Sequence, residues 1–335
     1  MKRRAFLGLP VLLGLGACAT PAVQAPLNPQ PGFAGPRLGD DVFVSFDGAR
    51  LGLTAWPAAG DAEPWAVIVA LHGMNDYANA FHLAAPAWAQ QGIATYAIDQ
   101  RGFGRSPGRG LWAGPDLMTE DLRSLVAAAR IRHPTAVLAV VGESMGGAVA
   151  IAAFASDRPP AADRLVLVAP AVWGWSSQPL PYKTSLWFTA RLFGDKVLRP
   201  PAFITRKVRA SDNLPELIAM GRDKLMIWGA RVDALYGLVQ LMERAWAGTG
   251  MVKIPTAYLY GARDDIIPAR PSIEAARRLP TGSRTAYYRD GWHLLLRDLQ
   301  APAVYRDVAS FLRDPSAPWP SAAPPIPRRV ARAAL

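Results

Sequence analysis

The sequence predicts an α/β fold, with a doubly wound, mostly parallel sheet and an inserted helical cap. Short apolar runs rich in branched residues alternate with helical stretches, as expected for strands that are buried on both faces. A hairpin signal precedes these runs, because residues 41–46 and 50–56 flank the turn Asp47-Gly48. The alternation stops between residues 171 and 250, which are rich in aromatic side chains, and then resumes.

The expected elements of the core follow one another in a regular order. The strand-like runs are "WAVIVALHG", "IATYAID", "AVLAVVG", "RLVLVAP" and "TAYLYG". Helical sequence separates them, because "ANAFHLAAPAWAQQG" ends at Gly92 and "DLMTEDLRSLVAAARIRHP" stops at Pro134. Repeated strand–helix units of this kind predict parallel strands with helices on both faces of the sheet. We therefore assign residues 39–170 and 251–313 to the core and residues 171–250 to a helical cap.

The two ends of the chain differ from the core in composition. Residues 1–17 combine a basic start with an apolar run, which predicts a secretory signal peptide. Residues 18–38 are rich in proline, alanine and glycine, and we expect a flexible tether there. Residues 314–335 are rich in proline and alanine, and we expect a disordered tail. The single cysteine, Cys18, excludes an intrachain disulfide.

The surroundings of Cys18 indicate where the protein resides. Leu15-Gly16-Ala17-Cys18 resembles the bacterial lipobox, in which the cysteine becomes the lipid-modified first residue. Because Ala19 follows Cys18, we expect an exported lipoprotein on the periplasmic face, in the outer membrane if the source cell has one. The alternative is cleavage at the A-x-A-like site of residues 17–19, which would leave a soluble periplasmic or secreted protein. An uncleaved apolar N-terminus on a cytosolic protein is the third interpretation.

The charge of the chain argues against one class of partner. The formal net charge is +11, but six basic residues lie at the two ends, within residues 2–4 and 328–332. The interior shows no clustered basic stripe, so nucleic-acid binding is not expected. The remaining positive excess favours contact with anionic membrane surfaces.

A candidate nucleophile lies in Gly142-Glu143-Ser144-Met145-Gly146, which fits the pattern G-x-S-x-G. The motif lies where an apolar strand meets a helix, which is the context of a nucleophile elbow. Such a turn strains the serine backbone, and the glycines Gly142 and Gly146 leave room for neighbouring backbone. The Ser144 hydroxyl then projects at the carboxyl edge of the sheet, where open α/β sheets bind ligands. The N–H of Met145, at the helix start, is a candidate donor to an oxyanion.

A serine nucleophile needs a base, and the chain has four histidines, at positions 72, 82, 133 and 293. Only His293 combines a loop after the last strand-like run with the chain order serine, acid, histidine. The acid is expected after a strand between the other two, where "YLYGARDDIIP" supplies Asp264 and Asp265, and both stay open. The loop His72-Gly73-Met74 follows the first long buried strand, so the N–H of Met74 is the second candidate oxyanion donor.

Five pieces of sequence carry a resemblance to a known family. They are "LHGMNDY", "DQRGFGRSPG", "GESMGG", "YGARDDIIP" and "GWHLLL", and they lie between residues 40 and 313. In this order they resemble α/β-hydrolases of the monoacylglycerol lipase and lysophospholipase group, which are serine aminopeptidase S33-like. The family places its acid three residues after a glycine and four before a proline, which implies Asp264, with Asp265 as the fallback. The resemblance also implies the α/β-hydrolase fold, a cap lining an acyl-chain pocket, and no cofactor or metal.

One position departs from many members of that group. They have histidine before the nucleophile, whereas this chain has Glu143. We expect the Glu143 carboxylate to point away beneath the elbow and to bond to loop amides. The alternative is that Glu143 tunes the local electrostatic field.

The leading functional hypothesis is a serine hydrolase that cleaves carboxylic esters of lipids, of the monoacylglycerol or lysophospholipid kind. Its catalytic residues would be Ser144, Asp264 and His293, and the N–H groups of Met74 and Met145 would hold the oxyanion. One alternative uses the same triad on peptides or on non-lipid esters. Another is a non-catalytic binding lipoprotein on the same fold. The expected partners are a small lipid ester and, through the lipid anchor, a membrane surface; the sequence predicts no oligomeric state.

Overall fold

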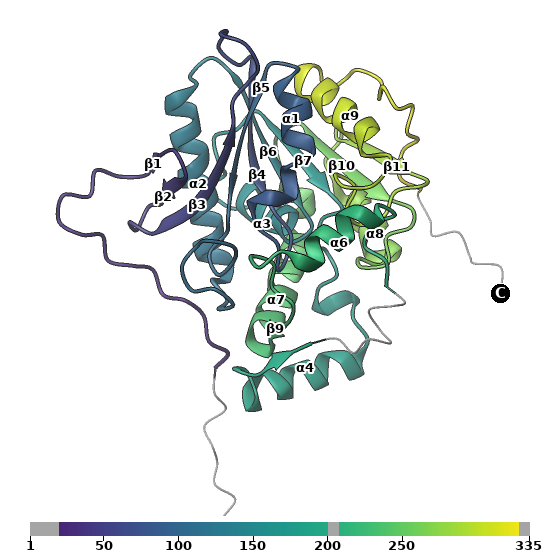
Figure 1. The fold of residues 1–335 in the computed structure, drawn as a ribbon. Helices are drawn as coiled ribbons and strands as arrows, with labels where there is room; N and C mark the ends of the chain where they lie inside the picture. The colour runs from purple at the N-terminus through teal and green to yellow at the C-terminus, as the bar shows by residue number, and fades with distance from the viewer. Residues whose placement is uncertain (1–19, 200–207, 328–335) are drawn as a thin grey trace, which may run out of the picture.

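The computed structural model describes residues 20–199 and 208–327. Within these residues, nine strands form one sheet in the order β1-β2-β3-β5-β4-β6-β7-β10-β11 (Figure 1). The strands are β1 (Arg37–Leu38), β2 (Val42–Val44), β3 (Arg50–Trp56), β4 (Ala66–Leu71), β5 (Ile93–Ile98), β6 (Val137–Glu143), β7 (Arg164–Val168), β10 (Thr256–Gly261) and β11 (Arg284–Tyr288). Strand β2 pairs antiparallel with β1 and with β3, and β3 pairs antiparallel with β5. The remaining neighbours in the sheet are parallel. The predicted mostly parallel sheet and its leading hairpin are confirmed.

The parallel strands read as continuous apolar runs because both of their faces are buried. Strand β4 shows this, since Val67, Val69 and Leu71 pack in one apolar core. Its alternate residues, Ala66, Ile68 and Ala70, pack in a second core on the other face of the sheet. A strand with only one buried face would instead alternate apolar with polar residues.

Helices cover both faces of this sheet, as a doubly wound fold requires. The helices are η1 (Ala78–Phe81), α1 (Ala84–Ala89), α2 (Gly114–Arg132), α3 (Met145–Phe154), η2 (Trp175–Ser177), α4 (Leu180–Leu192), α6 (Leu214–Arg222), α7 (Val232–Gly248), η3 (Thr249–Met251), α8 (Ala269–Arg278) and α9 (Ala301–Arg313). Helices α1 and α9 lie on one face, and α2, α3, α7 and α8 lie on the other. Within the described residues, no helix is both long enough and apolar enough to cross a membrane.

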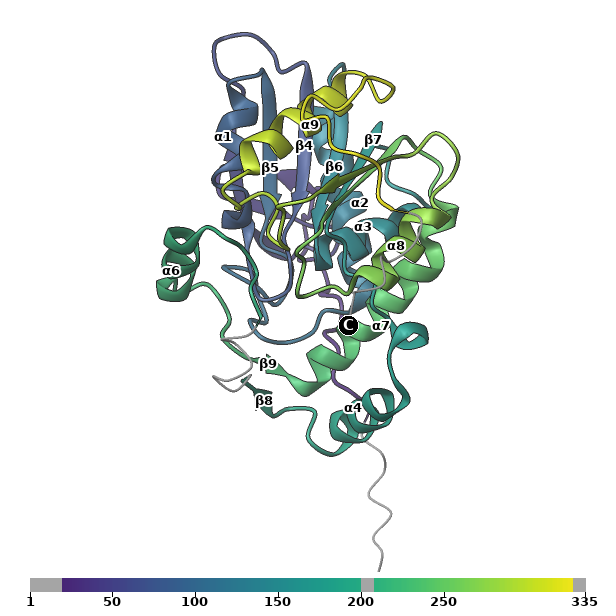
Figure 2. The same cartoon turned by 90° about the vertical axis from the view of Figure 1, so that its right-hand side faces the viewer.

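The inserted segment lies beyond the carboxyl ends of the parallel strands (Figure 2). It contains α4, α6 and a small antiparallel pair formed by β8 (Val197–Leu198) and β9 (Ala230–Arg231). Its boundary differs from the expected residues 171–250, because α7 belongs to the helical layer of the core. Leu241 and Ala245 of α7 are fully buried in the same apolar core as α3. Aromatic content alone could not separate this core helix from the cap.

The proline-rich ends are more ordered than expected over their described parts. Tyr287 of β11 donates its backbone N–H to the carbonyl of Pro324 at 2.8 Å, so residues 314–327 cover the outer edge of the sheet. Trp319 is buried and donates its indole N–H to the carbonyl of Thr285 at 3.0 Å. This differs from the expected disordered tail. Prolines have no N–H group to donate, but the backbone carbonyls of the tail and the ring of Trp319 still bind the open edge of the sheet. Residues 328–335 lie outside the described part.

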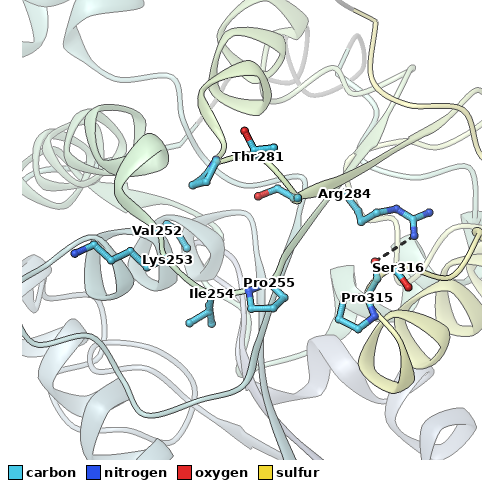
Figure 3. Close-up of a pocket in the computed structure, with 11 residues that line it drawn as sticks. Val252, Lys253, Ile254, Pro255, Thr281, Arg284, Pro315 and Ser316 are labelled. Carbon is cyan, nitrogen blue, oxygen red and sulfur yellow. Dashed lines mark hydrogen bonds between the residues drawn. The ribbon is translucent and has the colours of Figure 1, made fainter.

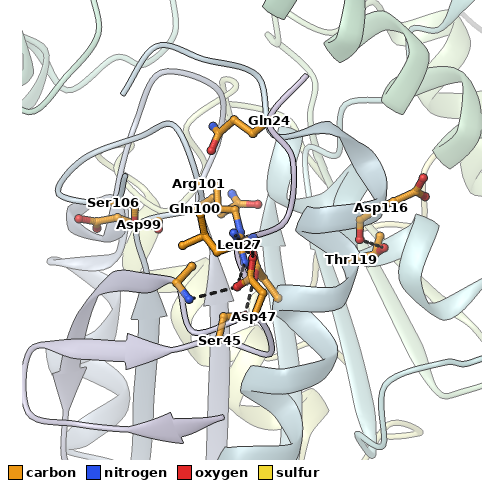
Figure 4. Close-up of polar contacts among 12 residues, drawn as sticks. Gln24, Leu27, Ser45, Asp47, Asp99, Gln100, Arg101, Ser106, Asp116 and Thr119 are labelled. Carbon is orange, nitrogen blue, oxygen red and sulfur yellow. Dashed lines mark hydrogen bonds and ion pairs between the residues drawn. The ribbon is translucent and has the colours of Figure 1, made fainter. Parts of the chain in front are cut away.

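The expected tether also contacts the core. The backbone N–H of Gln24 donates to the carbonyl of Trp112 at 2.9 Å. The N–H of Leu27 donates to Asp47 Oδ2 at 2.8 Å, and Arg101 holds the same carboxylate (Figure 4). Residues 20–36 therefore run along the surface as a strap. The predicted signal peptide and Cys18 lie outside the described residues.

Candidate active site

Ser144 lies at the turn between β6 and α3, in a backbone conformation that residues with side chains usually avoid. Its φ is 51° and its ψ is −115°. Hydrogen bonds hold this turn on both sides. The Ser144 N–H donates to the Val168 carbonyl at 2.9 Å, and its carbonyl accepts from the N–H of Ala171 at 2.9 Å. The surrounding backbone thus stabilises a strained position and leaves 9 % of the serine exposed.

The two glycines of the motif are required by space. A Cβ on Gly142 would lie 2.6 Å from the carbonyl oxygen of Gly146. A Cβ on Gly146 would lie 2.1 Å from the carbonyl oxygen of Leu71 at the end of β4. The sharp turn is therefore possible only because these positions have no side chain.

His293 and Asp264 meet in a buried pair. Asp264 follows β10 and His293 follows β11, so neighbouring parallel strands deliver both to the same sheet edge. His293 Nδ1 lies 2.9 Å from Asp264 Oδ2, while Asp264 Oδ1 accepts the N–H groups of Ile266 and Ile267 at 2.8 and 2.9 Å. Asp265 is exposed, and its carboxylate accepts the N–H of Arg209 at 3.2 Å. The geometry thus pairs His293 with the aspartate that the family pattern selects.

Neighbouring carboxylates favour the protonated form of His293 more strongly than burial disfavours it. Burial alone would lower the pKa of the His293 imidazole. The charge and hydrogen bond of Asp264, with the charge of Glu143, outweigh that effect and raise the pKa above its usual value. This arrangement stabilises the imidazolium that forms when a histidine accepts a proton.

The loop His72-Gly73-Met74 lies against Ser144, because a Cβ on Gly73 would be 3.2 Å from Ser144 Cβ. His72 fixes this loop. Its Nε2 accepts the N–H of Gln100 at 2.9 Å, so Nδ1 carries the proton and donates to the Gly73 carbonyl at 2.7 Å. That carbonyl and the Met74 N–H belong to one planar trans peptide and point in opposite directions. Holding the carbonyl therefore orients the Met74 N–H.

Met145 is the first residue of α3 and is fully buried. The first N–H groups of a helix have no partner within the helix, and the positive end of the dipole lies there. The N–H of Met145 is therefore available to an anion next to Ser144. Its side chain packs in the apolar core.

Glu143 does not bond to loop amides as we expected. It is fully buried beneath the elbow, and its Oε2 accepts from Arg297 Nη2 at 2.9 Å. The same Arg297 nitrogen lies 2.7 Å from Asp76 Oδ2. Burial raises the pKa of Glu143 above its usual value, although the charge of Arg297 opposes this rise. The partner of Glu143 is the Arg297 guanidinium and not the expected loop amides, because a fully buried carboxylate needs a charged partner.

The family of the chain follows from its match to known sequences. The family described as serine aminopeptidase, S33 matches residues 62–300, which include the elbow, the Asp264–His293 pair and the cap. The chain belongs to this S33 family. Strand order and family match together confirm the α/β-hydrolase fold.

Individual relatives of this S33 hydrolase include lipases. The chain is 29% identical over 280 residues to a monoacylglycerol lipase of Mycolicibacterium smegmatis, covering 81% of this chain and 95% of that protein. It is 24% identical over 272 residues to a monoglyceride lipase of Rattus norvegicus, covering 79% and 86%. A soluble variant of the Saccharomyces cerevisiae monoglyceride lipase, solved with a substrate analog, has a similar fold. Its TM-score is 0.69 at 17% identity, covering 88% of this chain and 100% of that one.

The contacts of the other two histidines of the S33 hydrolase are with residues other than Ser144 and Asp264. His133 accepts a hydrogen bond from, or donates one to, the Tyr96 hydroxyl at 2.8 Å, beside the start of β6. His82 lies 3.5 Å from the Glu216 carboxylate of cap helix α6. Both therefore have local roles. Within the described residues, no group of three or more histidine, cysteine or carboxylate side chains is placed to hold a metal ion.

Two cavities of the S33 hydrolase differ in position and character. One of about 340 Å³ lies beneath cap helix α4 and is lined mainly by aromatic side chains: Trp175, Lys183, Thr184, Trp187, Phe188 and Tyr236. Another, of about 480 Å³, is lined by residues such as Ile254, Pro255 and Arg284 (Figure 3). The second lies where β10 and β11 begin, at the sheet edge opposite the elbow, so it is remote from Ser144.

Sequence reasoning missed three residues that support the site. Arg297, Asp76 and Gln100 are all buried, and each contacts a loop that carries a predicted site residue. Arg297 carried a usable signal, because it is a charged residue within the apolar sequence "WHLLLRD". A charge in such a run is buried only with a partner. The sequence did not identify that partner, which is distant along the chain.

Proposed function

We propose that this protein, a carboxylic ester hydrolase, cleaves lipid esters of the monoacylglycerol or lysophospholipid class through an acyl-enzyme formed on Ser144. The observation that carries the proposal is the buried hydrogen bond of 2.9 Å between His293 and Asp264. It lies at the sheet edge where Ser144 occupies a strained elbow. A histidine that is oriented by an acid, at the same sheet edge as such a serine, is the kind of base that a hydroxyl nucleophile needs.

Each residue has one role in the proposed reaction. Ser144 Oγ attacks the ester carbonyl while His293 Nε2 takes the hydroxyl proton, and Asp264 stabilises the resulting imidazolium. The Met74 and Met145 N–H groups donate to the tetrahedral oxyanion, each contributing about 3–4 kcal/mol of transition-state stabilisation. His293 then protonates the leaving alcohol, which leaves an acyl ester on the serine. A water molecule, deprotonated by His293, attacks this ester and releases the fatty acid.

The cap supports a lipid substrate. Helix α4 buries only Ala190, whereas Leu180 and Leu192 are each 70% exposed and Phe188 is 57% exposed. Exposed apolar side chains of this density are typical of surfaces that meet a partner or a lipid phase. The aromatic cavity beneath α4 offers apolar space next to the same surface. The names of the relatives, which are monoacylglycerol lipases, point to the same substrate class.

We also propose that the enzyme works at a membrane through a lipidated Cys18. The lipobox-like sequence before Cys18 supports this location, with export to the periplasmic face. Mass spectrometry of the mature protein tests it. A lipid-modified N-terminal cysteine is expected, whereas an unmodified N-terminus at Thr20 would instead indicate a soluble exported protein.

A labelling experiment tests the catalytic assignment. A fluorophosphonate probe should modify the wild type and a Ser156→Ala control, but not Ser144→Ala. Asp264→Asn should lower kcat on p-nitrophenyl butyrate by roughly 10⁴-fold, because the imidazole is then held in the wrong tautomer. Asp265→Asn should change kcat little, and the reverse order would transfer the acid role to Asp265.

A series of substrates tests the class of ester. Monoacylglycerols and lysophospholipids with acyl chains of two to eighteen carbons are compared by kcat/KM. We expect preference for medium or long chains. Preference for acetyl esters would indicate a non-lipid esterase, and faster cleavage of peptide anilides would indicate a peptidase.

A further inference from the structure

We propose that Arg297 is a positioning residue that holds three segments together. They are the oxyanion loop (residues 72–76), the nucleophile elbow (residues 142–146) and the loop that carries His293. Its guanidinium Nη2 lies 2.7 Å from Asp76 Oδ2 and 2.9 Å from Glu143 Oε2. Asp76 lies two residues after Met74, and Glu143 directly precedes Ser144. Arg297 itself follows His293 by four residues. One buried cation therefore belongs to one of the three segments that carry the proposed chemistry and contacts the other two. This role rests on the proposed ester hydrolysis.

On the side of the oxyanion loop, Asp76 connects Arg297 to the peptide that carries the Met74 N–H. Its backbone N–H donates to the Gly73 carbonyl at 3.3 Å, and its Oδ1 accepts the N–H of Tyr77 at 2.8 Å. The Gly73 carbonyl shares its peptide plane with the Met74 N–H. A shift of Asp76 would therefore rotate the proposed oxyanion donor, and Arg297 prevents that shift by holding the carboxylate.

On the histidine side, the backbone around Arg297 forms a tight turn. The N–H groups of Arg297 and Asp298 both donate to the Leu294 carbonyl, at 2.7 and 3.0 Å. Asp298 Oδ2 in turn accepts the N–H of Trp292 at 2.7 Å. These bonds enclose His293 within one hydrogen-bonded loop. Anchoring the Arg297 side chain to Glu143 therefore fixes this loop relative to the elbow.

The cap meets the same arginine. The side-chain amide of Asn213 donates to the Arg297 carbonyl at 2.9 Å, and Asn213 is the N-terminal cap of helix α6. The Arg297 Nη1 lies 3.6 Å from the sulfur of Met220 on that helix. Arg297 thus also links the cap to the catalytic loops.

The cluster is arranged poorly for stability alone. It buries one cation with two carboxylates, and removing three charges from water costs more than well-packed apolar residues would. Glu143 Oε1 and Arg297 Nε are buried and have no hydrogen-bond partner within the described residues. Incomplete pairing weakens such a network as a stabiliser. Its specific contribution is to fix the relative positions of three loops.

The test uses Arg297→Gln, Glu143→Gln, the double variant of both, and Arg297→Lys. Arg306→Gln is the matched control, because Arg306 is exposed on α9 and loses the same charge. The rate of Ser144 modification by a fluorophosphonate is measured together with the thermal unfolding midpoint. This probe reports nucleophile and oxyanion geometry without knowledge of the natural lipid.

We expect Arg297→Gln to slow labelling about 100-fold, the size of effect seen when an oxyanion donor is lost. Arg297→Lys should stay within about tenfold of wild type, because an ammonium can still donate to both carboxylates. The double variant keeps the net charge of the cluster, so its unfolding midpoint should recover relative to Arg297→Gln. Its labelling rate should remain low.

Two results would overturn the positioning role. One is recovery of labelling together with the unfolding midpoint in the double variant, which would mean that Arg297 acts only through stability. The other is labelling of Arg297→Gln at the wild-type rate, with the proposed function intact. If the wild type neither reacts with the probe nor hydrolyses esters, the proposed function fails, and this inference fails with it.

Discussion

Gln100 holds His72 from two sides. Its backbone N–H donates to His72 Nε2 at 2.9 Å, and its side-chain amide donates to the His72 carbonyl at 2.8 Å. Both residues are buried, and burial lowers the pKa of His72 below its usual value. The imidazole is therefore neutral, with its proton on Nδ1 facing the Gly73 carbonyl. His72 is therefore a fixed part of the proposed oxyanion loop, and we expect His293, not His72, to act as the base.

This relationship predicts the effect of His72→Leu. The variant removes the donor to the Gly73 carbonyl, so the Met74 N–H is less well oriented. We expect kcat on p-nitrophenyl butyrate to fall by about 10- to 100-fold, somewhat less than complete loss of one donor, with KM nearly unchanged. His82→Leu is the control, because His82 contacts Glu216 of the cap. Equal activity of both variants would show that His72 does not orient the loop.

The electrostatic effect of Glu143 on His293 predicts a change in the pH dependence of the reaction. A base must be unprotonated, so kcat/KM should rise with pH through the pKa of His293, which lies above its ordinary value of 6.5. Glu143 is one of the charges that raise this pKa, and Arg297 lowers it. Glu143→Gln should therefore move the acid limb of the profile to lower pH.

The control for that shift is Glu274→Gln on the outer helix α8, which should leave the limb in place. A limb that stays fixed in Glu143→Gln would mean that Glu143 has no electrostatic effect on His293. A limb that moves to higher pH would contradict the sign of the interaction. Fluorescence-monitored unfolding of each variant separates these outcomes from loss of folded protein.

Replacement of each of two glycines by alanine is expected to change the stability of the protein in opposite directions. In Gly146→Ala the new Cβ would overlap the Leu71 carbonyl, and backbone cannot move aside as a flexible side chain can. We expect the free energy of unfolding to fall by about 3 kcal/mol or more. In Gly221→Ala the Cβ meets nothing within 4 Å inside helix α6, so the free energy should rise by up to about 1 kcal/mol. Urea denaturation of both variants measures these changes.

Much of this fold could be predicted because its signals are local. The buried parallel strands appear as apolar runs, and the elbow at Ser144 appears as glycines at fixed spacing between a strand and a helix. The choice of His293 followed from chain order, and that of Asp264 from the family pattern. Each of these signals is contained in a few consecutive residues.

The partners of charged residues could not be predicted, because they depend on distant parts of the chain. Glu143 and Arg297 are separated by 154 positions, and no local pattern joins them. The proline-rich tail was misjudged for a similar reason. Its composition reports how the segment would behave alone, whereas the open edge of β11 supplies the hydrogen bonds that order it.

The exposed face of α4 predicts that binding to lipid vesicles and hydrolysis of a dissolved ester respond differently to substitutions on this helix. Leu180→Ser with Leu192→Ser removes two side chains that are each 70% exposed. A leucine contributes roughly 2 kcal/mol when fully buried in an apolar phase, so even partial insertion of two should matter. We expect binding to phosphatidylglycerol-containing vesicles to weaken about tenfold or more. Hydrolysis of dissolved p-nitrophenyl butyrate should be unchanged, because neither residue contacts the proposed catalytic groups.

The matched control is Ile131→Ser, since Ile131 is 81% exposed but lies at the end of α2 near the start of β6. This places it at the sheet edge opposite the cap. All proteins carry Cys18→Ser, so that a lipid anchor cannot mask the contribution of the helix. If Ile131→Ser weakens vesicle binding as much as the α4 variant does, the cap surface is not the membrane contact. If the α4 variant loses activity on the dissolved ester as well, the helix acts on the site itself.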